Sequence, residues 1–179
     1  MIERLMSTIG CVALLTLGGA VPAFAQKASA GDLAVGYDIL HDSGTTFPLG
    51  WVVAYGGNVS RTTALVAEAS GSYKSLNVLG TSVSLSEHAF LGGVRFKGGS
   101  RNVTGFGQAL VGLARLGAGV LGTSASANTL CIQPGAGVDI RLSGAAAFRI
   151  QGDYRFLHSS SSGNANEFRI AFGVAFEIR

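Results

Sequence analysis

Phe168-Arg169-Ile170-Ala171-Phe172-Gly173-Val174-Ala175-Phe176-Glu177-Ile178-Arg179, the final stretch of the chain, alternates strictly between two kinds of side chain. Large apolar residues occupy every even position, and charged or very small residues occupy every odd position. A period of two indicates a β-strand that has one apolar face and one polar face. The polar face carries Arg169, Glu177 and Arg179 among alanine and glycine, so it suits a narrow polar interior, whereas the bulky face suits lipid. This pattern predicts a strand of a transmembrane β-barrel.

The composition of the whole chain agrees with this prediction. The 179 residues are enough for one domain. Only 13% of them are charged, about half the usual globular fraction, and the mean hydropathy is +0.40. Beyond the N-terminal region no apolar run is long enough for a transmembrane helix, so alternating strands explain the high hydropathy. The net charge of +3 is small and dispersed, which argues against a nucleic-acid partner.

The N-terminal region has the pattern of a secretory signal peptide. Arg4 precedes an apolar segment from Ile9 to Ala20, and Ala23-Phe24-Ala25 forms a cleavage site of the A-x-A type. We therefore expect residues 1–25 to be removed and residues 26–179 to form the barrel domain.

The two cysteines do not predict a disulfide. Cys11 lies inside the signal peptide, and lipid attachment there is disfavoured because most of the apolar segment follows it. Its removal leaves Cys131 as a single thiol, which we expect to be buried or at the edge of the lumen.

The mature chain predicts eight strands whose connections alternate between long and short. The expected strands are 33–40, 51–57, 64–73, 90–96, 103–116, 130–142, 148–156 and 168–179. The expected long loops are 41–50, 74–87, 117–128 and 158–166, with short turns at 58–63, 97–100 and 143–146. The phase of strand 103–116 stays open because Phe106 and Leu110 share parity with Gln108, and Pro134 predicts a bulge or a break in the ladder. The fold class is therefore all-β, an eight-stranded antiparallel up-and-down transmembrane β-barrel.

Aromatic residues fall near both ends of the expected strands. One group is Trp51, Tyr73, Phe90, Phe156 and Phe168, and the other is Tyr55, Phe96, Phe148 and Phe176. Two aromatic girdles with an apolar band between them are typical of outer-membrane barrels. The alternative is a soluble up-and-down barrel such as a lipocalin, which would place the aromatic side chains inside and the charges outside.

The arrangement resembles a known family of proteins. Pro134-Gly135-Ala136-Gly137-Val138-Asp139-Ile140-Arg141, followed by Arg149-Ile150-Gln151-Gly152-Asp153-Tyr154-Arg155, is similar to the end of bacterial porin-like barrel domains. The whole mature chain resembles the small outer-membrane β-barrels, the class of the OmpA transmembrane domain and OmpX. The resemblance implies a bacterial outer-membrane location, assembly by the barrel-assembly machinery, a monomer, and contact with outer-membrane lipids and lipopolysaccharide. One departure is that family members usually finish on an aromatic residue, whereas Arg179 follows the last aromatic residue, Phe176.

Strand parity predicts a charged lumen. The residues assigned to the lumen network are Asp38, Glu68, Arg95, Asp139, Arg141, Arg149, Asp153, Arg155, Arg169, Glu177 and the last residue, Arg179. Eight strands enclose a space that side chains can fill, and charges in such a space must pair. The sequence therefore predicts an ion-paired, mostly closed lumen; the alternative is a narrow pore for small solutes.

The sequence offers few candidates for chemistry. His41, His88 and His158 lack the spacing of metal ligands, and no cofactor fingerprint is present, so neither a metal nor a cofactor is expected. His158 and Ser160 form a His-x-Ser pair similar to that of outer-membrane lipid A deacylases, which is the enzymatic alternative. The main expectation is a non-enzymatic barrel with a structural or surface-interaction role. In this role Arg115 and Lys74 would meet anionic headgroups.

Overall fold

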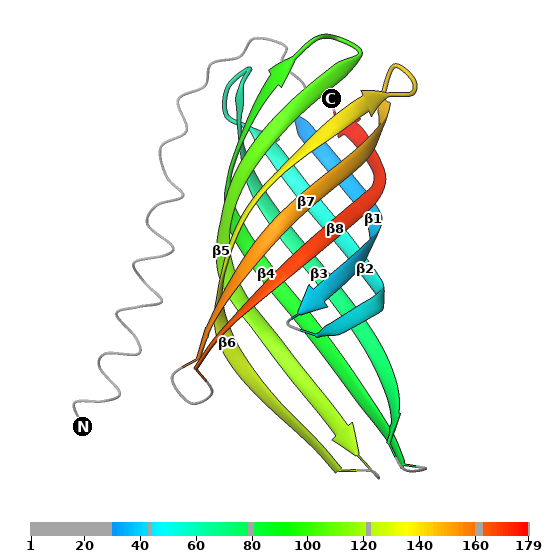
Figure 1. The fold of residues 1–179 in the computed structure, drawn as a ribbon. Helices are drawn as coiled ribbons and strands as arrows, with labels where there is room; N and C mark the ends of the chain where they lie inside the picture. Colours follow the sequence, from blue (N-terminus) through cyan, green and yellow to red (C-terminus); the bar gives the residue numbers. More distant parts are fainter. Residues whose placement is uncertain (1–29, 43, 79–80, 121–122, 160–162, 179) are drawn as a thin grey trace, which may run out of the picture.

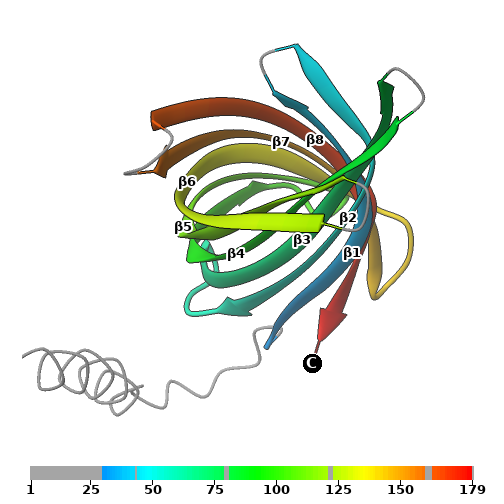
Figure 2. The ribbon, with the colours of Figure 1, turned by 90° about the horizontal axis from the view of Figure 1, so that it is seen from below.

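The protein is a closed barrel of eight antiparallel strands (Figures 1 and 2). The computed structural model describes residues 30–42, 44–78, 81–120, 123–159 and 163–178, so the predicted signal peptide lies outside the described residues. The strands are β1 (Gly31–Asp42), β2 (Thr45–Asn58), β3 (Thr63–Val78), β4 (Thr81–Gly99), β5 (Val103–Val120), β6 (Thr123–Arg141), β7 (Ala146–Ser159) and β8 (Gly163–Ile178). Each strand pairs with the next in sequence, and β1 pairs with β8 from Gly31↔Ile178 to Asp42↔Glu167, which closes the sheet. No helix among the described residues is long and apolar enough to cross a membrane.

The two ends of the barrel differ. The terminal end, at the top of Figure 1, holds the start of β1, the end of β8 and the turns at 59–62, 100–102 and 142–145. The distal end holds the four hairpins β1–β2, β3–β4, β5–β6 and β7–β8. The β3–β4 and β5–β6 hairpins extend well beyond the other two (Figure 1). Short turns face the periplasm in barrels of this kind, so the distal end is the cell-surface side.

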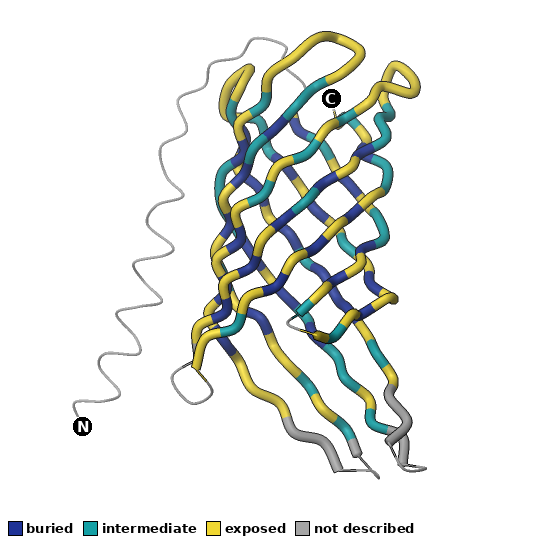
Figure 3. The backbone as a smooth tube through the Cα atoms, viewed as in Figure 1, coloured by how far each residue is buried: buried dark blue, intermediate teal, exposed yellow. Residues whose placement is uncertain are grey.

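Burial alternates along every strand, as Figure 3 shows by colour. In β1, Val35 and Ile39 are exposed on the outer wall, whereas Asp38 between them is completely buried. Large apolar side chains are exposed on the outer wall of all eight strands, among them Trp51, Phe90 and Phe172. An apolar outer wall with buried charges needs a lipid surrounding, so the soluble-barrel alternative is wrong.

The strands are longer than the sequence pattern predicted, and the prediction of four long loops was wrong. Most residues of 41–50, 74–87, 117–128 and 158–166 continue the antiparallel ladders, for example Lys74↔Leu85 in β3–β4 and Gly117↔Ser126 in β5–β6. The predicted turns at 58–63, 97–100 and 143–146 are short, as expected, although β4 runs on to Gly99. Residues beyond the membrane need no apolar face, so the period-two signal stops while backbone pairing continues.

Two open points of the sequence pattern are settled by the structure. In β5, Phe106, Gln108 and Leu110 are all buried, so large apolar residues share the lumen with the glutamine. The β6–β7 ladder passes from Ile132↔Phe156 to Gly135↔Asp153 without pairing Pro134, which confirms the predicted local break and leaves the register unchanged. Cys131 is a buried free thiol, in an apolar cluster with Leu91, Leu110 and other side chains.

Candidate functional site

The centre of the lumen is organised by Arg169 on β8, which is completely buried. Its Nη2 lies 2.6 Å from Asp153 Oδ2 and 2.7 Å from Glu68 Oε1, and its Nη1 lies 3.5 Å from Asp38 Oδ2. The three carboxylates come from β7, β3 and β1. One guanidinium therefore joins four strands across the barrel, as the planar fork of arginine permits.

Glutamines donate further hydrogen bonds to two of these carboxylates, Glu68 and Asp153. Gln133 Nε2 donates to Glu68 Oε1 at 3.0 Å, and Gln151 Nε2 donates to both oxygens of Asp153 at 2.9 Å. Gln108 Nε2 also reaches Asp153 Oδ1 at 3.4 Å. Neutral donors add hydrogen bonds without adding charge, so the carboxylates can remain buried.

A second cluster lies toward the distal end around Arg155. Its Nη1 is 2.8 Å from Glu87 Oε1, its Nη2 donates to Ser70 Oγ at 2.8 Å, and its Nε donates to Gln133 Oε1 at 2.7 Å. Glu167 pairs with Arg155 in the β7–β8 ladder and is also buried. Gln133 contacts both Arg155 and Glu68, so it connects this cluster with the central one.

A third cluster lies toward the terminal end around Asp32. Arg95 Nη1 and Arg149 Nη2 approach Asp32 Oδ1 at 3.1 and 3.0 Å, and Lys97 Nζ approaches Oδ2 at 2.8 Å. Arg149 also binds both oxygens of Asp139, at 2.7 and 2.8 Å. The Phe106 ring lies under both guanidinium groups, with its centroid 4.6 and 4.9 Å from their central carbons, an arrangement that adds cation–π attraction.

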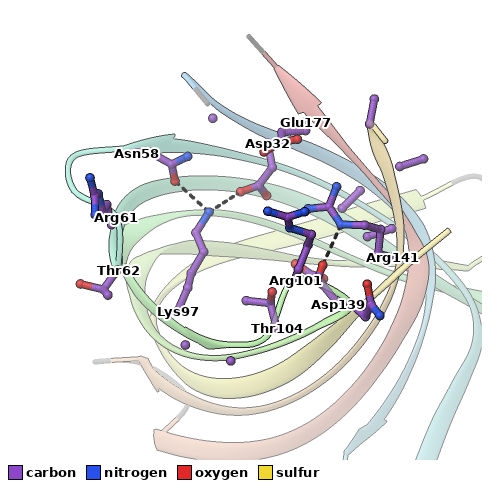
Figure 4. Close-up of a pocket in the computed structure, with 18 of the residues that line it drawn as sticks. Asp32, Asn58, Arg61, Thr62, Lys97, Arg101, Thr104, Asp139, Arg141 and Glu177 are labelled. Carbon is purple, nitrogen blue, oxygen red and sulfur yellow. Dashed lines mark hydrogen bonds and ion pairs between the residues drawn. The ribbon is translucent and has the colours of Figure 1, made fainter. Parts of the chain in front are cut away.

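Beyond the third cluster the terminal end contains a cavity of about 510 Å³, which we call the vestibule (Figure 4). Its charged lining residues are Asp32, Arg61, Lys97, Arg101, Asp139, Arg141 and Glu177. Arg141 Nε donates to the backbone oxygen of Arg101 at 2.8 Å, and its Nη1 donates to that of Gly144 at 3.2 Å.

The structure places most residues of the predicted lumen network inside the barrel, and those at its terminal end differ from the prediction. Asp38, Glu68, Arg95, Arg149, Asp153, Arg155 and Arg169 are buried, and Asp139 is half-buried and paired. Arg141 and Glu177 point to the correct face but line the vestibule, and neither forms an ion pair with another described residue. The backbone carbonyls of the turns hold Arg141 because it stands at the very end of β6. Arg179 lies outside the described residues.

Sequence reasoning missed several members of the network. Asp32, Glu87 and Lys97 were placed outside strands, and Gln108 fell on the strand with an open phase. Asp32, Glu87 and Lys97 each lie at an even sequence distance from a residue of the same strand whose inward face was recognised, for example Lys97 from Arg95. Extending the parity outward would have found them.

A polar and aromatic group, which we call the outward band, lies on the outer wall toward the distal end. Trp51 Nε1 donates to the Tyr73 hydroxyl at 3.3 Å, and that hydroxyl lies 3.0 Å from His88 Nε2. Across the β4–β5 ladder His88 is the neighbour of Arg115, whose Nη2 donates to Ser126 Oγ at 3.0 Å. The expectation for Lys74 was wrong, because Lys74 has the lumen-facing parity of the buried Ser72.

The histidines give no catalytic or metal-binding arrangement within the part of the chain that the structure describes. His158 is exposed, and its Nδ1 lies 2.6 Å from Asn164 Oδ1, while Ser160 lies outside the described residues. Glu167, the nearest acid considered for this pair, faces the lumen. His41 Nδ1 contacts Thr46 Oγ1 at 2.8 Å. Among the described residues no group of three or more potential ligands could hold a metal ion.

Solved structures with the same architecture identify the fold. Neisserial surface protein A matches with a TM-score of 0.65 at 10% identity, over 83% of this chain and 96% of that chain. The chain has the fold of the small outer-membrane β-barrels. Ail, the attachment invasion locus protein of Yersinia pestis, solved with the heparin analogue sucrose octasulfate, matches at 0.53 with 15% identity over 82% of this chain and 99% of that chain. The N-terminal β-barrel domain of Pseudomonas aeruginosa OprF matches at 0.51 with 12% identity, over 82% and 98%.

This barrel and its lipid-facing wall place the protein in the bacterial outer membrane. No protein-family model matches the sequence, and no curated protein matches it. At these low identities the structural similarity establishes the fold and leaves the activity to be argued from the residues of this chain.

Proposed function

We propose that the protein is a non-enzymatic outer-membrane barrel that acts through its cell-surface side, with a lumen closed to steady conduction. The observation that carries this proposal is the bridging of four strands by Arg169 in the centre of the barrel. An eight-stranded barrel has an interior just wide enough for side chains. Here large polar side chains occupy that interior in three clusters. Gln133 connects the distal cluster with the central one, and Gln108, which accepts from Arg95 Nε at 2.9 Å and donates to Asp153, connects the terminal cluster with the central one. This supports a closed lumen rather than a narrow pore.

The outward band is the part of the wall best suited to contact lipopolysaccharide. Trp51 and Tyr73 are amphipathic aromatics of the kind that settle at a membrane interface, and Arg115 offers a cation at the same end. Anionic headgroups attract such cations by about 1 kcal/mol each near the surface. The Ser126 contact uses only one nitrogen of Arg115, so its other donors can reach a phosphate.

The binding experiment compares unfolding in phospholipid vesicles with and without lipid A. A ligand that binds only the folded state stabilises it, so lipid A should raise the unfolding midpoint of the wild-type protein. Arg115→Gln should lose most of this increase. Arg61→Gln, which removes an arginine from the opposite end, is the matched control and should keep it. Equal increases for the wild type and Arg115→Gln would refute lipopolysaccharide contact through the outward band.

The proposed absence of catalysis is supported by the surroundings of His158. Its ring pairs with the amide of Asn164, and the Glu167 carboxylate lies on the lumen side of the wall. A nucleophile would need a base that is oriented by a third group. Mass spectrometry of lipid A should show the same acyl chains with the wild-type protein and with Ser160→Ala. Loss of an acyl chain that requires Ser160 would establish the deacylase alternative instead.

A further inference from the structure

The vestibule at the terminal end plays no part in the proposed surface contacts. It is lined by hydroxyl and amide side chains together with charged ones: Asn58, Ser60, Thr62, Asn102 and Thr104 supply the neutral polar groups. None of its described lining residues is aromatic. Most small-molecule pockets are largely apolar, so this lining favours a strongly polar occupant.

The floor of the vestibule is formed by Asp32 and Lys97 (Figure 4). Lys97 Nζ lies 2.8 Å from Asp32 Oδ2 and 2.8 Å from Asn58 Oδ1. Asp32 also receives Arg95 and Arg149, so three cations surround this one carboxylate. Lys97 Nζ can therefore donate a hydrogen bond to a ligand while Arg95 and Arg149 keep Asp32 paired.

Two buried arginines, Arg95 and Arg149, place further positive charge directly behind the floor. Arg95 and Arg149 are 0% and 5% exposed, and Arg95 Nη2 and Arg149 Nη1 are buried with no hydrogen-bond partner among the described residues. The cluster contains three cations, Arg95, Lys97 and Arg149, against the two carboxylates Asp32 and Asp139. A low-dielectric wall focuses the field of such an excess into the cavity.

The mouth adds further cations. Arg61 lies in the β2–β3 turn, Arg101 in the β4–β5 turn and Arg141 at the end of β6, and Figure 4 shows all three beside the cavity. In the described part of the chain none of them forms an ion pair with a carboxylate, and the acids of the lining are Asp32, Asp139 and Glu177. Counting floor and mouth together, six cations face three acids: Arg61, Arg95, Lys97, Arg101, Arg141 and Arg149 against Asp32, Asp139 and Glu177.

We propose that the vestibule binds a small, polar oxyanion, with a phosphate or carboxylate group, from the periplasm. Arg61 and Arg101 would meet the oxyanion at the mouth, and Lys97 would meet it at the floor. Guanidinium groups bind both kinds of oxyanion through paired, charge-assisted hydrogen bonds. The amides and hydroxyls of the lining then accept and donate hydrogen bonds to the rest of the ligand. A cavity of about 510 Å³ has room for a molecule the size of an amino sugar.

Titration of the detergent-solubilised full-length protein at low salt tests this proposal, with backbone amide chemical shifts as the readout. Inorganic phosphate and N-acetylmuramic acid, a carboxylate-bearing sugar, serve as the two probes. Binding of either probe should shift amides at residues 58–62 and 97–102. The probe that binds more tightly identifies a phosphate or a carboxylate as the natural group. Salt should weaken the binding because the mouth is open to solvent.

The variant Arg61→Gln/Arg101→Gln should weaken this binding at least tenfold, since each lost charge-assisted hydrogen bond costs about one factor of ten. Lys74→Gln, in β3 at the distal end of the barrel, is the matched control and should bind like the wild type. Arg61 and Arg101 are both exposed, and a preserved heat-dependent gel mobility verifies that the double variant folds. Absence of shifts with both probes would overturn the proposal, as would equal weakening by Lys74→Gln. Shifts that arise only with phosphatidylglycerol vesicles would also overturn it and assign the arginines to membrane headgroups.

Discussion

Arg169 is completely buried, yet it keeps three carboxylates within 3.5 Å. Removing a guanidinium from water costs several kcal/mol, and nearby opposite charges offset this cost only when the geometry and the hydrogen bonds are good. The glutamines beside Glu68 and Asp153 add hydrogen bonds to those two carboxylates, whereas Arg169 Nη1 has no hydrogen-bond partner among the described residues. We therefore expect the network to specify one arrangement of the strands more than it adds net stability.

Asp153→Ala should lower the free energy of unfolding by about 3 kcal/mol, because it leaves Arg169 short of its nearest partner. Urea unfolding in lipid vesicles measures this change. Glu177→Ala is the control, since Glu177 is a strand carboxylate without an ion pair to any described residue, and its effect should stay within about 0.5 kcal/mol. Equal losses for the two variants would show that the ion pair between Asp153 and Arg169 does not contribute to the free energy of unfolding.

Gly135 stands opposite Asp153 in the β6–β7 ladder, and an added Cβ would collide with the Asp153 carboxylate and with the backbone of Gly152. Gly135→Ala should therefore destabilise the barrel by about 1–3 kcal/mol. Gly107→Ala is the matched control, because nothing lies within 4 Å of a Cβ at that glycine. Its unfolding midpoint should equal or exceed that of the wild type. Equal effects of the two alanines would show that the collision with Asp153 does not determine stability at Gly135.

The sequence predicted most of the lumen network because a residue's face follows from parity alone. Asp38, Glu68 and Arg155 were found in this way. Asp32 and Lys97 were missed because the predicted strands 33–40 and 90–96 ended one residue short of them, although Leu33 and Phe96 continue the alternation. The pairing of three cations with Asp32 joins β1, β4 and β7, and such a contact across the barrel leaves no local signal in the sequence.

Among the secondary-structure elements, the eight strands were predicted from the sequence, whereas the lengths of the distal hairpins were not. The membrane-spanning part of each strand must keep an apolar face, so its pattern is strong. The distal hairpins need only backbone pairing, so their glycine-, serine- and alanine-rich sequences resemble loops. The extent of the β3–β4 and β5–β6 hairpins was therefore hidden from the sequence pattern.

Barrel closure depends on β8, which pairs with β1 on one side and β7 on the other. Deleting residues 168–179 should abolish the difference in gel mobility between unheated and boiled protein, since both β1 and β7 would lose their partner and the sheet would open. As a control, deleting residues 77–82 from the tip of the β3–β4 hairpin should preserve the difference. Survival of the mobility shift without residues 168–179 would contradict the observed closure.

At the scale of the whole molecule, charge is distributed unevenly along the barrel. The central and distal clusters contain two arginines against five acids, namely Arg155 and Arg169 against Asp38, Glu68, Glu87, Asp153 and Glu167. The terminal end has the opposite balance, with six cations against three acids around the vestibule and its floor. An anion entering the vestibule therefore meets a favourable end and an unfavourable centre, which suits binding rather than passage.

The conductance of the purified protein in a planar lipid bilayer shows whether the ion-paired network closes the lumen. The wild-type protein should show no steady open level, because Arg169 and its partners occupy the centre of the barrel. Asp153→Ala should admit water around Arg169 and produce brief openings together with its loss of stability. Continuous conductance by the wild type, with Asp153→Ala changing ion selectivity but not stability, would contradict closure of the lumen and make the charges the lining of a pore.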